Sequence, residues 1–190
     1  MKVGILAVQG DFEAHRKMLE RLGAETAFVK TPADLESLDA LVLPGGESTT
    51  QLQFLNDEGL FAPIAERGGK TLPIFGTCAG AILLASEVKN PAQASLGLVD
   101  MTVVRNAYGP QIESCVTQGI TTLSDRPLEM VFIRAPVIER VGPSVAVLAR
   151  RDDKPILVRQ GRILAATFHP ELTDDATIHS YFLKMVRDER

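Results

Sequence analysis

The stretch PIFGTCAGAILLA, residues 73–85, places a cysteine at the junction between a predicted buried strand and a predicted helix. The apolar run that ends at Phe75 favours a strand, and the apolar run after the cysteine favours a helix. A turn this tight strains its central residue and needs small residues two positions before and two positions after it. Gly76 and Gly80 occupy those positions around Cys78. The spacing predicts a nucleophile elbow that carries a thiol, whereas the alternative is a buried cysteine that only packs.

The sequence before this elbow predicts a parallel α/β arrangement. Apolar runs that suit strands buried on both faces alternate with amphipathic helical segments, which is typical of a sheet covered by helices on both sides. The predicted strands are 3–8, 24–30, 39–44 and 72–75. The predicted helical segments are 12–22, 33–38, 48–55, 60–67 and 79–85.

The sequence after the elbow is richer in short strands. Runs of β-branched residues between Gly, Pro and Asp turns predict strands at 98–104, 112–118, 128–133, 144–150, 155–160 and 162–170. A closing helix is expected at 174–187, and residues 86–97 match no fixed pattern and are expected to form a variable loop. We therefore expect an α/β fold with three layers: a mixed, mainly parallel sheet with helices on both faces. A single domain should span residues 1–190.

The composition of the chain excludes some kinds of binding partner. The chain has 190 residues and a net charge of −4, and it contains no basic run longer than two residues, which argues against a nucleic-acid surface or an anionic membrane surface. No apolar stretch approaches the roughly 20 residues that cross a bilayer. Two cysteines, Cys78 and Cys115, make no disulfide framework, and Cys115 is expected only to pack. We expect a cytoplasmic protein.

A candidate base for the thiol follows the last predicted strand. His169 ends the apolar run ILAATF, and Pro170 and Glu171 come next. In an extended segment residues i and i+2 project to the same side, so Glu171 can accept a hydrogen bond from Nδ1 of His169 and leave Nε2 for the thiol. The other histidines lie in predicted helices: His15 in the first, where a surface or partner contact is expected, and His179 in the last.

The segment LPGGEST, residues 43–49, also follows a predicted strand. Gly45 and Gly46 allow a backbone that exposes an N–H group toward a ligand. The alternative is a plain tight turn before a helix capped by Ser48. Beside an elbow and a His-Glu pair, we interpret the segment as an oxyanion loop, with the N–H of Ala79 as a second donor.

The motifs PGG, GTCAG and FHPE, in this order, resemble those of class I glutamine amidotransferases over almost the whole chain. The resemblance implies a flavodoxin-like fold and a thioester mechanism. Cys78 would attack the side-chain amide of glutamine, and water would then release glutamate. His169 would act as base and then as acid, oriented by Glu171. The backbone N–H groups of Gly46 and Ala79 would hold the oxyanion.

Four longer segments, GILAVQGDFEAH (4–15), LPGGESTT (43–50), RNAYGPQIES (105–114) and FIRAP (132–136), resemble the glutaminase subunits of pyridoxal 5′-phosphate synthase, the PdxT/SNO type. This resemblance implies that L-glutamine is bound by Gly46, Glu47, Ser48, Arg105, Ile133 and Arg134. Two arginines and one glutamate suit the α-carboxylate and the α-ammonium of a free amino acid.

The same resemblance implies a partner and no cofactor. Ammonia would pass to a synthase barrel subunit in a hetero-oligomer that makes the vitamin B6 cofactor. The segment Gln9-Gly10 would lie beside the oxyanion loop, and docking of the synthase would reorganise it and complete the oxyanion hole.

Three alternatives stay open. The chain could serve another synthase, for example in histidine or nucleotide synthesis. It could be a cysteine hydrolase that acts on peptides or small amides, or a non-catalytic binding or stress protein. A metal site is not expected because the histidines and cysteines lack ligand spacing, and no phosphate-binding G-x-x-x-x-G-K motif is present.

Overall fold

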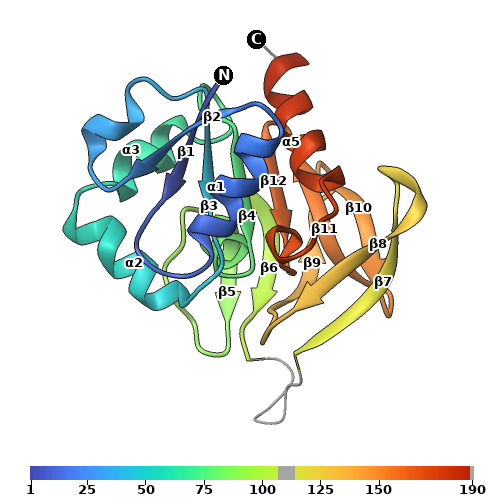
Figure 1. Cartoon of the computed structure of the whole chain (residues 1–190). Coiled ribbons are helices and arrows are strands. Elements are labelled where there is room, and N and C mark those ends of the chain that lie inside the picture. The colour runs from blue at the N-terminus through green and yellow to red at the C-terminus, as the bar shows by residue number, and fades with distance from the viewer. Residues whose placement is uncertain (107–113, 189–190) are drawn as a thin grey trace.

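The computed structural model describes residues 1–106 and 114–188 and contains a central mixed sheet with helices on both faces (Figure 1). The strands of this sheet are β1 (Lys2–Leu6), β2 (Glu25–Val29), β3 (Ala40–Leu43), β4 (Ile74–Thr77), β7 (Cys115–Thr121), β8 (Ser124–Phe132), β10 (Ala146–Arg151), β11 (Lys154–Gln160) and β12 (Ile163–Ala166). Their order in space is β2-β1-β3-β4-β12-β11-β10-β7-β8. A second, three-stranded sheet is formed by β5 (Ala85–Lys89), β6 (Val99–Val104) and β9 (Val137–Val141).

The large sheet is parallel at one end and antiparallel at the other. Strands β2, β1, β3, β4 and β12 pair in parallel, whereas β12, β11, β10, β7 and β8 pair antiparallel. The expected α/β fold with a mixed sheet is confirmed. Strands β3, β4 and β12 are adjacent and parallel, so the segments that follow them emerge at the same edge of the sheet, where ligands bind in such folds.

The helices divide between the two faces of this sheet (Figure 1). They are α1 (Phe12–Arg21), η1 (Pro32–Leu35), α2 (Ser48–Asp57), α3 (Phe61–Arg67), α4 (Ala79–Leu84), η2 (Pro170–Leu172) and α5 (Thr177–Asp188). Side chains of α1 and α5 pack into one apolar cluster, and side chains of α2, α3, α4 and the small sheet pack into another. Among the described residues, none of the helices has both the length and the apolar character needed to cross a bilayer.

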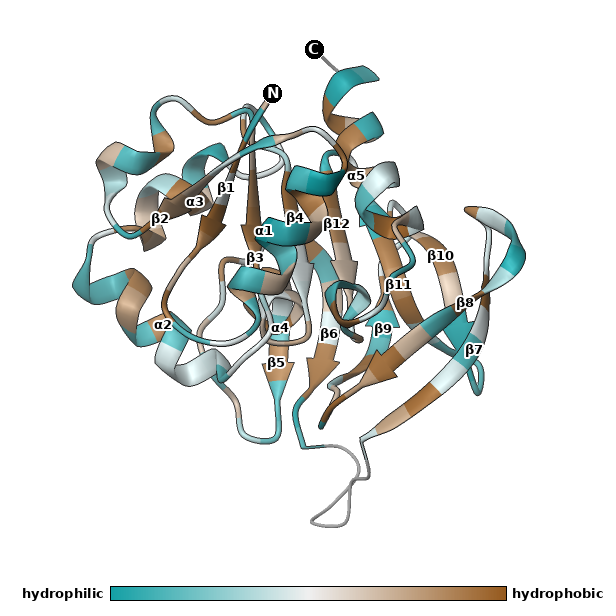
Figure 2. Ribbon diagram, viewed as in Figure 1, coloured by the Kyte–Doolittle hydropathy of each residue, from teal (hydrophilic) through white to brown (hydrophobic). Residues whose placement is uncertain are grey.

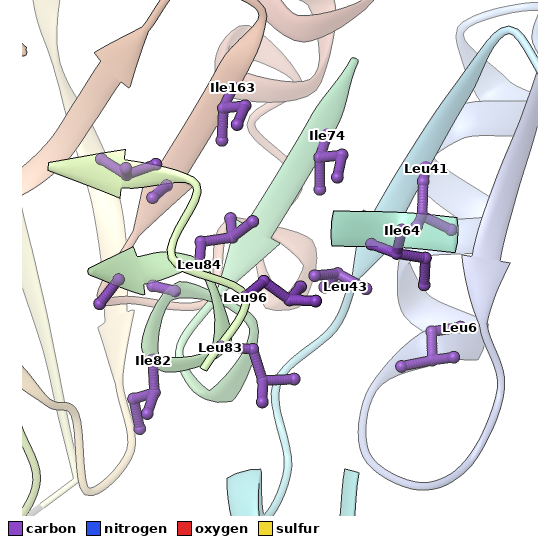
Figure 3. Close-up of a cluster of buried hydrophobic side chains, with 14 of the residues drawn as sticks. Leu6, Leu41, Leu43, Ile64, Ile74, Ile82, Leu83, Leu84, Leu96 and Ile163 are labelled. Carbon is purple, nitrogen blue, oxygen red and sulfur yellow. The ribbon is translucent and has the colours of Figure 1, made fainter. Parts of the chain in front are cut away.

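Strand residues alternate between these two clusters. Ala40 and Val42 of β3 pack with α1 and α5, whereas Leu41 and Leu43 pack on the opposite face with α3 and α4 (Figure 3). All four side chains are fully buried. This is why the central strands are apolar at successive positions, while the helices carry polar residues outward (Figure 2).

The structure differs from the sequence-based expectation at several elements. Residues 86–97 are not wholly a loop, because β5 extends to Lys89. Strand β9 was also not predicted, since its central residues Glu139 and Arg140 are charged and exposed. The last helix starts at Thr177, three residues later than expected, and the strand expected at 162–170 ends at Ala166. Strand β7 begins at Cys115, and residues 112 and 113 of its predicted range lie outside the described residues.

Candidate active site

Cys78 lies at the turn between β4 and α4, with the backbone angles φ 48° and ψ −101°. A positive φ is strained for a residue other than glycine, and such strain is found at functional sites. A methyl group on Gly80 would collide with the carbonyl oxygen of Leu43, and one on Gly76 would lie 2.7 Å from the carbonyl carbon of Gly80. The two glycines therefore let the elbow approach the neighbouring strand. The Cys78 amide donates to the Ala166 carbonyl at 2.8 Å, which ties the elbow to β12.

His169 follows β12 and is buried beside the elbow. Its Nδ1 lies 2.8 Å from Oε1 of Glu171, and its backbone N–H donates to the Val131 carbonyl at 2.8 Å. Gly45 makes room for the ring, because a methyl group there would collide with Cε1 of His169. Within the described part of the chain, the buried Nε2 of His169 has no other hydrogen-bond partner and remains available to the thiol.

The charges around His169 favour the protonated form of its ring. Burial by itself lowers the pKa of His169, but interaction with the neighbouring Cys78 sulfur and with the hydrogen-bonded carboxylate of Glu171 outweighs burial and raises that pKa to about 10. Burial likewise opposes ionisation of Glu171, yet the imidazoles of His15 and His169 hold the pKa of this carboxyl well below its usual range. Glu171 is thus an anion that orients His169 and stabilises its protonated form.

A pocket of about 270 Å³ opens over Cys78 and His169. All six residues expected to bind substrate line it: Gly46, Glu47, Ser48, Arg105, Ile133 and Arg134. It is also lined by four residues that the sequence did not single out: Asp11, Ile82, Asn106 and Pro136. Ala79 and Glu171 are buried but do not line the pocket. In RNAYGPQIES only Arg105, Asn106 and Ser114 are described; residues 107–113 lie outside the described residues.

Glu47 and Arg105 form an ion pair at this pocket, with 3.1 Å between Oε1 of Glu47 and Nη2 of Arg105. Glu47 is also the N-cap of α2, accepting from the backbone N–H groups of Thr49 and Thr50 at 3.1 Å and 2.7 Å. Partial burial raises the pKa of Glu47, but these N–H groups and the Thr hydroxyls outweigh it and hold that pKa below its usual value. The helix cap therefore keeps an anion beside a cation at the pocket.

Arg134 is a second cation on the pocket wall, and its φ of 43° is positive. Among the described residues it has no carboxylate within ion-pair distance. The preceding carbonyl, that of Ile133, accepts a long hydrogen bond of 3.9 Å from Sγ of Cys78. The segment that bears both residues thus contacts the thiol and carries a positive charge that is free to meet an anionic ligand.

The expectation that His15 contacts the surface or a partner is wrong. His15 is completely buried, because it shares one face of α1 with Met18 and Leu19 at the spacing i, i+3, i+4. Its Nε2 lies 3.4 Å from Oε2 of Glu171. This helical spacing, applied to a histidine as well as to the apolar residues, was the signal available in the sequence.

Asp11, at the start of α1, is a further carboxylate near the catalytic pair. Its Oδ2 lies 3.4 Å from Nδ1 of His169, and ligand atoms of Asp11, His169 and Glu171 lie within 4.8 Å of one another. Three ligand atoms at this spacing are of the kind that can bind a metal cation. Here, however, Nδ1 of His169 is engaged with Oε1 of Glu171, an arrangement suited to orienting a proton.

Two other segments qualify the sequence-based expectations. Gln93, in the supposed variable loop, accepts a hydrogen bond from the Ser48 hydroxyl at 3.1 Å, so this loop supports the pocket wall. Cys115 is half-buried in β7, where its sulfur lies 3.2 Å from Nη1 of Arg151. It lies at the start of a strand and has no elbow.

Comparison with known proteins agrees with this geometry. A sequence profile of the SNO glutamine amidotransferase family matches residues 5–188. The chain belongs to this family. Among proteins similar to this member of the SNO family, "Pyridoxal 5′-phosphate synthase subunit PdxT" of Koribacter versatilis is 56% identical over 188 residues, which are 99% of this chain and 97% of that protein. The protein of the same name from Thermotoga maritima is 50% identical over 98% of this chain and 100% of its own length.

Solved structures show the same relationship. A crystal structure described as a glutamine amidotransferase superposes with a TM-score of 0.91 at 47% identity, covering 97% of this chain and 98% of the other. A chain of PurLQS from Thermotoga maritima superposes with a TM-score of 0.67 at 17% identity, covering 96% and 97%, and shares the fold alone. The matches to these relatives therefore extend over nearly the whole of this chain, from the first strand to the last helix.

Proposed function

We propose that residues 1–190 form a single glutaminase domain that hydrolyses L-glutamine to glutamate and ammonia and delivers the ammonia for synthesis of pyridoxal 5′-phosphate. The observation that carries the proposal is one pocket in which a strained thiol, Cys78, meets a buried imidazole, His169, beside the charged side chains of Glu47, Arg105 and Arg134. Relatives that match this chain over nearly its full length are named as the PdxT subunit of that synthase.

The reaction follows from the positions of the two side chains. The proton of the Cys78 thiol passes to Nε2 of His169, Sγ attacks the side-chain carbonyl carbon of glutamine, and the same proton then passes to the departing nitrogen, which leaves as ammonia. The now neutral His169 takes a proton from water as that water attacks the thioester. The bond to sulfur then breaks and releases glutamate. Glu171 holds His169 in the orientation that both proton transfers need.

The oxyanion of both tetrahedral intermediates is assigned to the backbone N–H groups of Ala79 and Gly46. Ala79 is the first residue of α4, and the first N–H groups of a helix have no partner within it. Gly46 lines the pocket over Cys78. Donors fixed in this way stabilise charge that develops only during reaction, which is why they accelerate it.

Recognition of the amino-acid end of glutamine is assigned to the charged rim. Arg134, which lacks a carboxylate partner among the described residues, suits the α-carboxylate, and Glu47 suits the α-ammonium. Arg105 already pairs with Glu47, so it holds this carboxylate in place and adds positive charge. Ser48 and the backbone of Gly46 and Ile133 complete the set that lines the cavity.

A synthase barrel subunit, in a hetero-oligomer, is the partner that this function requires. We infer that docking acts on Gln9 and Gly10, which precede α1. Nε2 of Gln9 donates to the Glu47 carbonyl at 3.0 Å, and a methyl group on Gly10 would collide with the Gly45 carbonyl oxygen. Movement of this segment is therefore transmitted directly to the oxyanion loop. A catalytic thiol also suits a reducing compartment, which supports the cytoplasm as its location.

The test is glutamate release from L-glutamine by the purified chain, alone and with a pyridoxal 5′-phosphate synthase subunit added. We expect strong activation by the synthase and its loss in Cys78→Ala, with Cys115→Ala as the matched control that keeps activity. Equal activity with and without the synthase would contradict the docking step. No activity in either mixture would overturn the proposed function.

A further inference from the structure

All three histidines of the chain meet in one buried group behind Cys78. Nδ1 of His15 lies 2.9 Å from Nε2 of His179, and Nε2 of His15 lies 3.1 Å from Oγ1 of Thr77 and 3.4 Å from Oε2 of Glu171. The other oxygen of Glu171 engages His169 at 2.8 Å. A continuous series of polar groups therefore links α5 and α1 to the catalytic imidazole.

The rings of His15 and His179 are held in fixed orientations. Both are fully buried, and both pack edge-to-face on Phe75 of β4, with ring centroids 5.9 Å and 5.5 Å away. Burying polar rings in an apolar cluster costs free energy unless they are hydrogen-bonded. If His15 and His179 served only to hydrogen-bond each other, Nε2 of His15 would not need to face the carboxylate of Glu171.

The charges around the group determine where its protons lie. Burial, together with the neighbouring His15, lowers the pKa of His179 to about 3, so His179 is neutral at neutral pH. Glu171 is ionised and can only accept hydrogen bonds. If Nε2 of His15 carried no proton, its lone pair would face a lone pair of the Glu171 carboxylate in an interior that excludes water. Nε2 of His15 must therefore carry a proton.

The remaining hydrogen bonds follow from that proton. The N–H at Nε2 of His15 points to Oγ1 of Thr77 at 3.1 Å, and Oε2 of Glu171 lies 3.4 Å from the same nitrogen. This carboxylate oxygen is buried and has no hydrogen-bond partner among the described residues, so His15 is the donor within reach of it. Nε2 of His179 lies 2.9 Å from Nδ1 of His15, so an N–H on that nitrogen of His179 can donate to Nδ1 of His15. His179 thus selects the form of His15 that presents a donor to the carboxylate.

We propose that His15 is a positioning residue for the glutaminase reaction, one that donates from Nε2 to Oε2 of Glu171 while Oε1 of Glu171 orients His169. This inference rests on the proposed function, in which His169 transfers protons to and from the substrate. A carboxylate held at both oxygens cannot rotate about its last bond. The direction of the His169 ring is therefore set jointly by α1, α5 and β4.

The first test locates the protons directly and does not depend on activity. Long-range ¹H–¹⁵N spectra of the ¹⁵N-labelled full chain report which ring nitrogens of each histidine carry a proton, and three histidines give three patterns. Variants His179→Gln and His169→Gln assign them. We expect a protonated Nε2 on His15 and a neutral His179. A bare Nε2 on His15 overturns the proposal, even if the chain proves to be an active glutaminase.

The second test compares variants in the complex with the synthase subunit. His15→Leu removes the donor, whereas His15→Gln keeps an N–H group near the position of Nε2. We expect about a 10- to 100-fold loss of kcat in His15→Leu at unchanged KM for glutamine, because one hydrogen bond to a charged group is lost. His15→Gln should recover most of the loss. Met18→Leu, on the same buried face of α1, should keep the wild-type kcat and serves as the control.

Each result of the second test decides the matter. An unchanged kcat in His15→Leu overturns the proposal, and so does an equal loss in folded His15→Gln. If His15→Leu does not fold, the proton positions found by the first test decide instead. An inactive wild-type complex would contradict the proposed glutaminase function and leave the spectroscopic result standing.

Discussion

Replacing Glu171 by glutamine tests the centre of the mechanism with a change of charge and almost none of volume. The pKa of His169 rises from 6.5 to about 10, which corresponds to about 5 kcal/mol of preference for the imidazolium. Interactions of His169 with Glu171 and with Cys78 together supply this free energy. If they contribute equally, the neutral amide removes about 2–3 kcal/mol and moves the pKa of His169 toward its usual value, an effect of roughly 10²-fold on the rate.

The amide also disturbs the proton positions. If its NH₂ group faces Nδ1 of His169, the ring must carry its proton on Nε2 and cannot accept another there. If its oxygen faces His169, the NH₂ group faces the donor of His15, 3.4 Å from the present carboxylate oxygen. Either conflict adds to the charge effect. We expect a loss of kcat on the order of 10³- to 10⁴-fold, at or somewhat below the loss of about 10⁴-fold that a carboxylate-to-amide change causes in a Ser-His-Asp triad.

The assay is glutamate release in the synthase complex, together with an NMR titration of His169. The matched control is Asp11→Asn, because Asp11 also has a carboxylate near Nδ1 of His169. Its distance is 3.4 Å rather than 2.8 Å, and its side chain is 38% exposed, so water screens it and the loss should be about 10-fold or less. A loss in Asp11→Asn equal to that in Glu171→Gln would refute the assignment of Glu171 as the orienting carboxylate.

Three further predictions concern the same site. Gly45→Ala should fold but lose most of its kcat, because the added methyl group displaces the ring of His169; circular dichroism and glutamate release together check this. Arg134→Gln should raise KM for glutamine about 10- to 100-fold by removing the partner of the α-carboxylate, whereas Arg140→Gln, whose guanidinium pairs with Asp100, should not; equal KM values would contradict the assignment. Stability should fall as pH rises from 6.5 toward 10, by at most about 1.4 kcal/mol per pH unit, because the folded state binds the proton of His169 more tightly than the unfolded state. Urea unfolding should show a flatter profile in His169→Gln, and parallel profiles would refute this linkage.

Local patterns were sufficient to predict the reactive groups. The glycines two positions from Cys78 are a requirement of the turn itself, so they were recognisable without any tertiary information. The pairing of His169 with Glu171 was predicted from their i, i+2 spacing, and the 2.8 Å hydrogen bond is present. The extended backbone assumed for that prediction is not, because β12 ends at Ala166 and Pro170–Leu172 form a 3-10 helix. The apolar central strands were predictable because both faces of the sheet are covered.

Contacts between distant segments were not predictable in the same way. Glu47 pairs with Arg105, 58 residues further along, because the loop after β3 and the end of β6 meet at one pocket. Strands β5 and β9 lie in a sheet of their own and have mixed polarity, so neither apolar runs nor strict alternation marked them.

The nucleophile elbow and the His-Glu pair could be predicted from the sequence because each involves residues within a few positions of one another, and the fold class followed from the alternation of apolar strands with amphipathic helices. The surroundings of that pair depend on tertiary packing. His15, His179 and Thr77 come from α1, α5 and β4, and their burial beside Glu171 results from the packing of two helices on one face of the sheet. A histidine in a helix has no preferred environment until its neighbours are in place, and here those neighbours exclude water and supply a carboxylate.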